Sequence, residues 1–190
     1  AALGDDDPVD VFVTPGHGLP AEMEAYEAAV AGDFFWSGRE LVSCGRLRKT
    51  EQSAQVSRVM IATGGTTAGP RFAVHTWATL ERAVHGLQTW LGGGPVDSVC
   101  VLPLHHVSGL MQAGRSYVSG GVLTVWEWPR LVAGDFPMLQ AKPGVLSLVP
   151  TQLARLLGVP GGLEWMQSFR CIFMGGAAMW PGLRERARAA

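Results

Sequence analysis

From residue 56 onward, short apolar runs alternate with longer amphipathic segments. The runs are four or five residues long and rich in Val, Leu and Ile; they fall at 59–62, 99–102, 122–125, 145–149 and 171–174. Strands buried on both faces of a parallel sheet have continuous apolar runs of this kind, and the intervening helices cover the sheet. The pattern therefore predicts an α/β fold with a mainly parallel sheet and flanking helices.

The segments between the runs have helical periodicity. Thr76 is a suitable N-terminal cap, and the apolar residues after it recur on one helix face: Trp77, Leu80, Val84, Leu87 and Leu91. The run Gly92-Gly93-Gly94-Pro95 predicts the end of this helix. Further helices are predicted over 108–119 and 151–157, and glycine follows each of them.

Residues 1–55 show no comparable pattern. We expect a strand over 9–14, a helix over 20–31 and a polar connector over 45–57. The chain is therefore expected to divide near residue 55 into a poorly assigned N-terminal segment, 1–55, and a main domain, 56–190.

Charge and cysteine content exclude several kinds of partner. The 15 Lys and Arg residues against 16 Asp and Glu give a net charge of −1, which argues against nucleic acid or an anionic membrane as the main partner. No apolar stretch approaches the roughly 18 residues that span a bilayer, so stable membrane insertion is not expected.

The scattered cysteines Cys44, Cys100 and Cys171 form no CxxC pair and predict reduced thiols in a cytoplasmic protein. The oligomeric state is left open.

A loop of small residues, 62–71, follows the first apolar run. Small side chains let the backbone approach a ligand, and consecutive N–H groups with hydroxyls and a cation suit a triphosphate. The candidate phosphate-binding residues are Thr63, Gly64, Gly65, Thr66, Thr67, Gly69 and Arg71. The alternative is a glycine-rich hairpin that binds nothing.

This loop does not match a Walker P-loop. Gly64 and Gly69 have the required spacing, but Pro70-Arg71-Phe72 replaces the Lys and Ser or Thr that bind phosphate and metal. Residues 72–75 also predict a strand, whereas a P-loop leads into a helix. We therefore reject that interpretation.

The loop instead resembles the phosphate-binding loop of the adenylate-forming superfamily, which includes acyl-CoA synthetases, aryl-CoA ligases and luciferases. The superfamily pattern is roughly [ST]-S-G-[ST]-T-G-x-P-K. The matching positions are Thr63, Gly65, Thr66, Thr67 and Pro70, and the departures are Gly64, Ala68 and Arg71. Arg71 in place of Lys keeps the charge but changes its reach and geometry.

Three further segments resemble the same superfamily in the same order. Residues 102–111 are similar to the pattern P-[LM]-[FYH]-H-x-x-G, with His106 at the family's histidine. Residues 147–157 resemble the strand and helix that follow, and 174–178 resemble the glycine turn on the acyl side. The amino-acid sequences of 106–112 and 147–153 are most similar to those of o-succinylbenzoate–CoA ligases of the menaquinone and phylloquinone pathway. The resemblance covers about 56–182, so residues 56–190 are expected to be part of an AMP-binding domain.

The resemblance implies an ATP-dependent ligase that adenylates a small aromatic carboxylic acid and transfers the acyl group to CoA, with Mg²⁺ bridging phosphate oxygens. It implies that His106 is catalytic and lines the acyl pocket, and that Ser108 or Thr151 donates to a carboxylate. The implied acyl site comprises His106, Ser108, Gly109, Thr151, Gly175, Gly176 and Ala177. No residue is assigned to the metal. The alternatives are another aryl- or fatty-acid ligase, or a noncatalytic nucleotide- or acyl-binding module.

Other superfamily parts are not found in the 190 residues: the Y-G-x-T-E segment, the ribose-binding Asp and the C-terminal domain with its catalytic Lys. We therefore expect a fragment of a longer enzyme, inactive alone.

Several other residues are expected to have structural roles rather than to bind a ligand. His105 and His106 are expected to point apart on a strand, and Arg115 is expected at the surface rather than on a substrate carboxylate. Trp126, Trp128 and Trp165 are expected in packing, and 184–188 on a solvated helix face.

Overall fold

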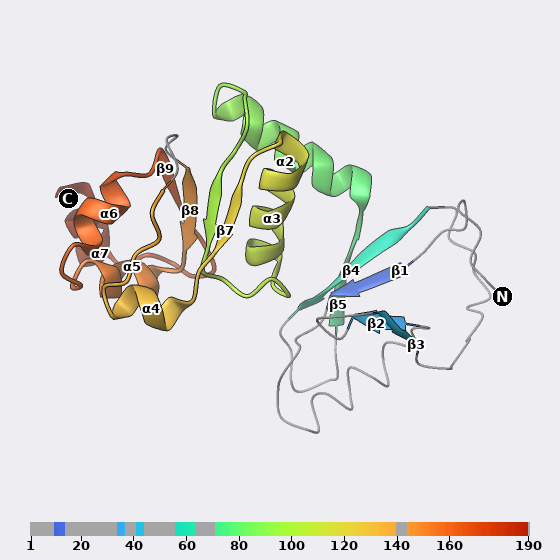
Figure 1. The fold of residues 1–190 in the computed structure, drawn as a ribbon, viewed down its shortest axis with the longest axis horizontal. Helices are drawn as coiled ribbons and strands as arrows, with labels where there is room; N and C mark the ends of the chain where they lie inside the picture. Colours follow the sequence, from blue (N-terminus) through green and yellow to red (C-terminus); the bar gives the residue numbers. More distant parts are fainter. Residues whose placement is uncertain are drawn as a thin grey trace. The chain divides into compact units, whose positions relative to one another are not determined.

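The computed structural model describes residues 10–13, 34–36, 41–43, 56–63, 71–139 and 144–189. The chain forms two compact units, Ala1–Thr79 and Leu80–Ala190 (Figure 1). No helix in the described part of the chain has the length and hydrophobicity needed to cross a membrane.

The first unit contains a three-stranded sheet and a two-stranded one. The strands are β1 (Asp10–Val13), β2 (Phe34–Trp36), β3 (Leu41–Ser43), β4 (Arg58–Thr63) and β5 (Arg71–Thr76). In the order β1-β4-β5, β4 pairs parallel with β1 and antiparallel with β5. Strands β2 and β3 form an antiparallel pair that the sequence pattern did not indicate.

The strands predicted over 9–14, 59–62 and 72–75 are confirmed within the described residues. The helix predicted over 20–31 lies outside them, as does the connector up to residue 55. Since β1 and β4 belong to one sheet, the division expected near residue 55 runs between two strands that are hydrogen-bonded to each other.

Helix α2 (Trp77–Trp90) begins at the predicted cap. The Thr79 N–H donates to Thr76 Oγ1 at 3.2 Å, and the Thr76 N–H donates to Thr79 Oγ1 at 3.1 Å. This reciprocal pair satisfies backbone groups that a helix start leaves without intrahelical partners. Leu80 and Val84 are buried as predicted, whereas Trp77 is exposed.

The second unit is built on a four-stranded parallel sheet, in the order β7-β6-β8-β9. Its strands are β6 (Ser98–Cys100), β7 (Leu123–Val125), β8 (Val145–Leu148) and β9 (Cys171–Met174). Its helices are α3 (Val107–Ser119), α4 (Trp128–Val132), α5 (Pro150–Leu156), α6 (Gly162–Gln167) and α7 (Pro181–Ala189). The predicted α/β fold with a parallel sheet and flanking helices is confirmed.

The two faces of this sheet have different chemistry. Helices α2 and α3 lie on one side of it, and α4 to α7 lie on the other (Figure 1). The second side holds the larger hydrophobic core: Val99, Val101, Leu131, Leu146, Leu148, Leu153, Leu156, Trp165, Met166, Phe169 and Leu183. The side facing α2 and α3 has a smaller apolar cluster, Leu91, Val96 and Val145, and buried polar residues that include Ser98, Gln112 and Ser116. Most of the apolar packing therefore lies on one face.

Predictions for the surface and the tryptophans also hold. Trp165 is buried, and Trp126 and Trp128 pack against the larger core. The charged residues of α7 from Arg184 to Arg186 are exposed, which agrees with a solvated helix face.

Candidate functional site

The predicted phosphate loop joins two paired strands. Its flanking residues, Thr63 and Arg71, are opposite each other in the β4–β5 register. The Thr63 hydroxyl donates to the Arg71 carbonyl oxygen at 3.2 Å, and both residues are exposed. Strand β5 follows the loop where a Walker P-loop requires a helix, so rejecting the P-loop was correct.

The loop itself, residues 64–70, lies outside the described part of the chain. The predicted residues Gly64, Gly65, Thr66, Thr67 and Gly69 therefore stay predictions. The structure fixes only where their two flanking strands begin and end.

The parallel sheet of the second unit contains a topological switch point. From β6 the chain crosses through α3 to β7 on one side, and from β8 it crosses through α5 and α6 to β9 on the other. Adjacent strands whose connections leave in opposite directions create a crevice outside their carboxyl ends, where α/β proteins bind ligands. The segments after β6, β8 and β9 are those in which the acyl site is predicted.

His106 lies in the turn between β6 and α3. Its N–H donates to the Pro103 carbonyl oxygen at 3.1 Å, and its own carbonyl oxygen accepts from Gly109 and Leu110 at the start of the helix. The ring centroids of His105 and His106 are 4.4 Å apart, and the His106 side chain is exposed. The expectation that the two rings point apart was wrong, because β6 ends at Cys100 and these residues form a turn rather than a strand.

Ser108 and Gly109, on the first turn of α3, have opposite surroundings. The Ser108 side chain is exposed, whereas Gly109 is buried. A Cβ atom at Gly109 would meet the backbone of Pro103 and Leu102, at 2.2 and 2.9 Å from their carbonyl oxygens. The space beside Gly109 is therefore filled by the chain's own backbone.

The segments after β8 and β9 present the other predicted acyl residues. Thr151 is exposed in the first turn of α5, and Gly175 to Ala177 are exposed after β9. The Gly175 N–H donates to the Leu148 carbonyl oxygen at 3.2 Å, which holds the two strand ends together. Gly176 has a φ of 79°, a left-handed conformation that favours glycine.

The expected surface position of Arg115 was also wrong. It is half-buried between α3 and the sheet, not at the surface. Its Nη1 donates to Ser147 Oγ at 3.4 Å, and its guanidinium carbon lies 5.1 Å from the centroid of the Phe173 ring. Helical spacing was the available signal, because Arg115 borders a stripe of small or polar buried residues at 109, 112 and 116.

The Arg115 charge has no counterion in the described residues. An ion pair in this part of the chain joins Arg130 and Asp135 and does not involve Arg115. Burial lowers the pKa of Arg115 from its ordinary value, while the nearby Cys171 acts in the opposite direction. Burial also raises the pKa of the Cys171 thiol, and the Arg115 and Arg170 charges offset part of that rise.

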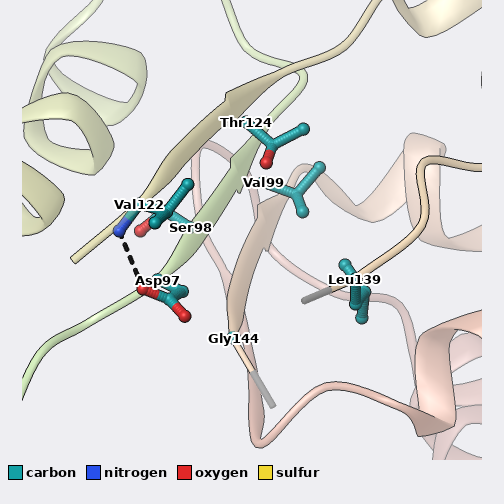
Figure 2. Close-up of a pocket in the computed structure, with 7 residues that line it drawn as sticks. All are labelled: Asp97, Ser98, Val99, Val122, Thr124, Leu139 and Gly144. Atoms are coloured by element: carbon teal, nitrogen blue, oxygen red, sulfur yellow. Dashed lines mark hydrogen bonds between the residues drawn. The ribbon is translucent and has the colours of Figure 1, made fainter. Parts of the chain in front are cut away.

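Two further cavities are lined by other residues. A space of about 20 Å³, room for one water molecule, lies beside the amino-terminal ends of β6, β7 and β8 (Figure 2). There Asp97 accepts a hydrogen bond from the Val122 N–H at 2.7 Å. An apolar groove of about 240 Å³ lies among α5, α6, α7 and β9. Neither cavity includes a predicted site residue.

The described residues give no assignment for the Mg²⁺ that the resemblance implies. Within these ranges, no group of three or more His, Cys, Asp or Glu side chains could hold a metal ion. No described residue is therefore assigned to Mg²⁺.

Comparisons with known proteins give a consistent result. A family model described as "AMP-binding enzyme" matches residues 8–190, so the match begins well before residue 56. The 2-succinylbenzoate–CoA ligase of Escherichia coli strain K12 is 34% identical over 132 residues, covering 68% of this chain and 27% of that protein. The ligase of the same name from Oceanobacillus iheyensis is 28% identical over 138 residues, with the same two shares. The chain thus spans about a quarter of the length of these relatives.

Solved structures agree with the fold. E. coli MenE with a bound m-phenylether-linked analogue of OSB-AMS is 30% identical, with a TM-score of 0.53, covering 79% of this chain and 30% of that one. The o-succinylbenzoate CoA synthetase from Bacillus subtilis, in complex with AMP, is 24% identical with a TM-score of 0.54. The match covers 69% of this chain and 27% of that one.

Proposed function

Because the chain belongs to the family of AMP-binding enzymes, we propose that the protein is an ATP-dependent acid–CoA ligase. A carboxylate oxygen attacks the α-phosphorus of ATP, which forms an acyl-adenylate and releases pyrophosphate. The thiolate of CoA then attacks the acyl carbon, and AMP leaves. Neither step requires a covalent bond to the protein, so its residues act by positioning and by electrostatic stabilisation.

The proposed acid is 2-succinylbenzoate, which would place the enzyme in menaquinone or phylloquinone biosynthesis. The E. coli relative, 34% identical over two thirds of this chain, carries that substrate in its name. This acid has two carboxylates, and adenylation consumes only one of them. The second carboxylate stays anionic through both steps and needs a cationic partner.

Arg115 is the observation that carries this choice of acid. Its guanidinium is half-buried, contacts Ser147 near the carboxyl end of β8, and has no carboxylate partner among the described residues. A guanidinium presents several N–H donors in a fork that matches a carboxylate, and such charge-assisted bonds are stronger than neutral ones. We assign Arg115 to the carboxylate that is not adenylated.

The acyl chain is proposed to bind at the carboxyl edge of the sheet. His106, Ser108 and Thr151 are exposed in the segments after β6 and β8, and Gly175 to Ala177 are exposed after β9. Ser108 and Thr151 each offer a hydroxyl donor. The glycines leave the backbone open to a flat aromatic ring. Gly109 is covered by the backbone of Pro103 and Leu102, so it contributes to the packing of this edge and not to its exposed surface.

The phosphates of ATP are proposed to bind the loop between β4 and β5. Thr63 and Arg71 hold its two ends in register, and Arg71 provides an exposed cation there. Consecutive backbone N–H groups of a small-residue loop form a concavity for anions, and Thr66 and Thr67 add hydroxyl donors. These groups would stabilise charge that develops on the leaving pyrophosphate.

A cytoplasmic location is also proposed. It rests on the scattered cysteines of the sequence, which form no CxxC pair.

The test is pyrophosphate release by the full-length gene product with ATP, CoA and a panel of acids. Release with 2-succinylbenzoate, and little with benzoate, other aryl acids or fatty acids, is the expected result. Release only with other acids would retain the ligase activity but reject this substrate. Saturable ATP binding without release for any acid would reject catalysis and select a binding module.

A further inference from the structure

We propose that Phe173 is a positioning residue that holds the Arg115 guanidinium ready for the substrate's second carboxylate. The proposal rests on the function proposed above. It concerns how a cation with no counterion among the described residues is held in place on the sheet.

The geometry brings three residues together on one face of the sheet. Ser147 and Phe173 are direct neighbours in the parallel register of β8 and β9, and each is the third residue of its four-residue strand. Arg115 reaches from α3 to both, with Nη1 3.4 Å from Ser147 Oγ and its guanidinium carbon 5.1 Å from the Phe173 ring centroid. The guanidinium is therefore held between two adjacent strands.

The partners of the Arg115 guanidinium are uncharged, which decides how much of its positive charge stays available to a ligand. A carboxylate would neutralise Arg115 and occupy its N–H donors, whereas an aromatic face attracts the cation without cancelling its charge. The Ser147 hydroxyl is also uncharged. The guanidinium is consequently fixed in place with its full positive charge and most of its donors available to an anionic ligand.

A second ring supports Phe173. Trp90, the last residue of α2, has its ring centroid 6.2 Å from that of Phe173, and the two planes are tilted by 51°. This distance and tilt lie within the range of favourable aromatic pairs. Phe173 is thus fixed from α2 while it contacts Arg115 from α3.

Fixing the arginine beforehand should lower the cost of binding the acid. A free arginine side chain loses substantial rotamer entropy when it is ordered on a ligand. Where Phe173 has already restricted Arg115, less of that entropy remains to be lost when the acid binds. Loss of Phe173 should therefore raise the KM for the diacid and leave kcat nearly unchanged.

The test compares nonaromatic and aromatic substitutions at this position in the full-length protein. Phe173→Leu and Phe173→Met keep an apolar side chain but remove the ring, and should raise the KM for 2-succinylbenzoate about five- to thirtyfold with kcat within about twofold. Phe173→Tyr retains the ring and should keep the KM of the wild type. Ile172→Leu, on the opposite face of β9, is the control for general disturbance of the strand, and thermal melting checks that each variant folds.

The outcomes separate this inference from the proposed function. If Phe173→Leu and Phe173→Met keep the wild-type KM while Arg115→Met raises it, Phe173 has no positioning role. If Phe173→Tyr fails as badly as the nonaromatic variants, packing alone explains the effect and the inference is overturned. If the unsubstituted protein releases no pyrophosphate with any acid, the proposed function itself fails.

Discussion

The carbonyl oxygen of Pro103 lies 2.2 Å from the point where Gly109 would carry a Cβ atom. Helix α3 can begin directly beneath its preceding turn only because that side chain is missing. The same turn contains His106, so the position of the proposed acyl edge depends on a glycine that is itself buried.

Gly109→Ala should therefore destabilise the protein. Overpacking against backbone typically costs about 1–3 kcal/mol, more than the roughly 0.5–1 kcal/mol that alanine gains over glycine inside a helix. Gly114→Ala on the same helix is the matched control, because its Cβ would lie 4.0 Å from Val84 Cγ2, an ordinary contact. Urea unfolding should show opposite signs for the two variants. Equal free energies of unfolding would contradict the close approach.

Arg115→Met should weaken binding of the diacid. Loss of a charge-assisted contact to the carboxylate is expected to raise the KM for 2-succinylbenzoate by roughly ten- to hundredfold, with the KM for ATP unchanged. Of the monoacid analogues 4-oxo-4-phenylbutanoate and 2-butanoylbenzoate, the one that keeps the adenylated carboxylate should be turned over equally well by the variant and the wild type. Arg155→Met removes an exposed arginine of α5 and serves as the control. An unchanged KM for the diacid would remove Arg115 from the site.

Alkylation of Cys171 should require an unusually high pH. Burial raises the pKa of its thiol, and the charge of Arg115 lowers it in part. The reactive species is the thiolate, so the pH midpoint of iodoacetamide labelling should exceed that of the unfolded chain, and Arg115→Met should move it higher still. Site-resolved mass spectrometry of labelled peptides measures both midpoints. A midpoint below that of the unfolded chain would contradict the burial effect.

The same pKa shift has a consequence for stability. A group whose pKa is higher in the folded state stabilises that state fully below its unfolded pKa. The Cys171 contribution should therefore be lost as the pH rises through the folded pKa.

Thr67→Val combined with Arg71→Ala should reduce ATP-dependent turnover by roughly two to three orders of magnitude, since it removes a hydroxyl donor and a cation from the phosphate loop. The melting temperature should not change, because Arg71 is exposed. Arg82→Ala, on the exposed surface of α2, provides the control. Turnover that survives the double substitution would show that ATP binds elsewhere.

The four strands of the second unit could be predicted from their apolar runs. The central strands β6 and β8 are buried throughout, whereas the edge strands β7 and β9 are partly buried. The run Val145–Leu148 is apolar almost throughout, and glycines follow α2, α3 and α5, where the chain turns back. The burial of the central strands thus appears directly in the sequence, and so does Thr76 as the cap of α2. The reciprocal hydrogen bond with Thr79 was not predicted.

Relationships between distant segments could not be predicted in this way. The pairing of β1 with β4 joins residues almost fifty positions apart, and composition contains no signal for it. The burial of Arg115 depends on Phe173 and Ser147, which lie far from it along the chain, on β9 and β8. The proximity of the His105 and His106 rings depends on where β6 ends, and strand ends are poorly marked by apolar runs.

The unequal faces of the four-stranded sheet should separate two effects of mutation. On the proposed function, substitutions at Arg115, Ser147 and Phe173, where the sheet faces α3, would alter which acid is accepted. Mutations among the leucines on the opposite face would instead threaten folding. Related ligases could thus diverge in substrate through one side of the sheet while inheriting the other nearly intact.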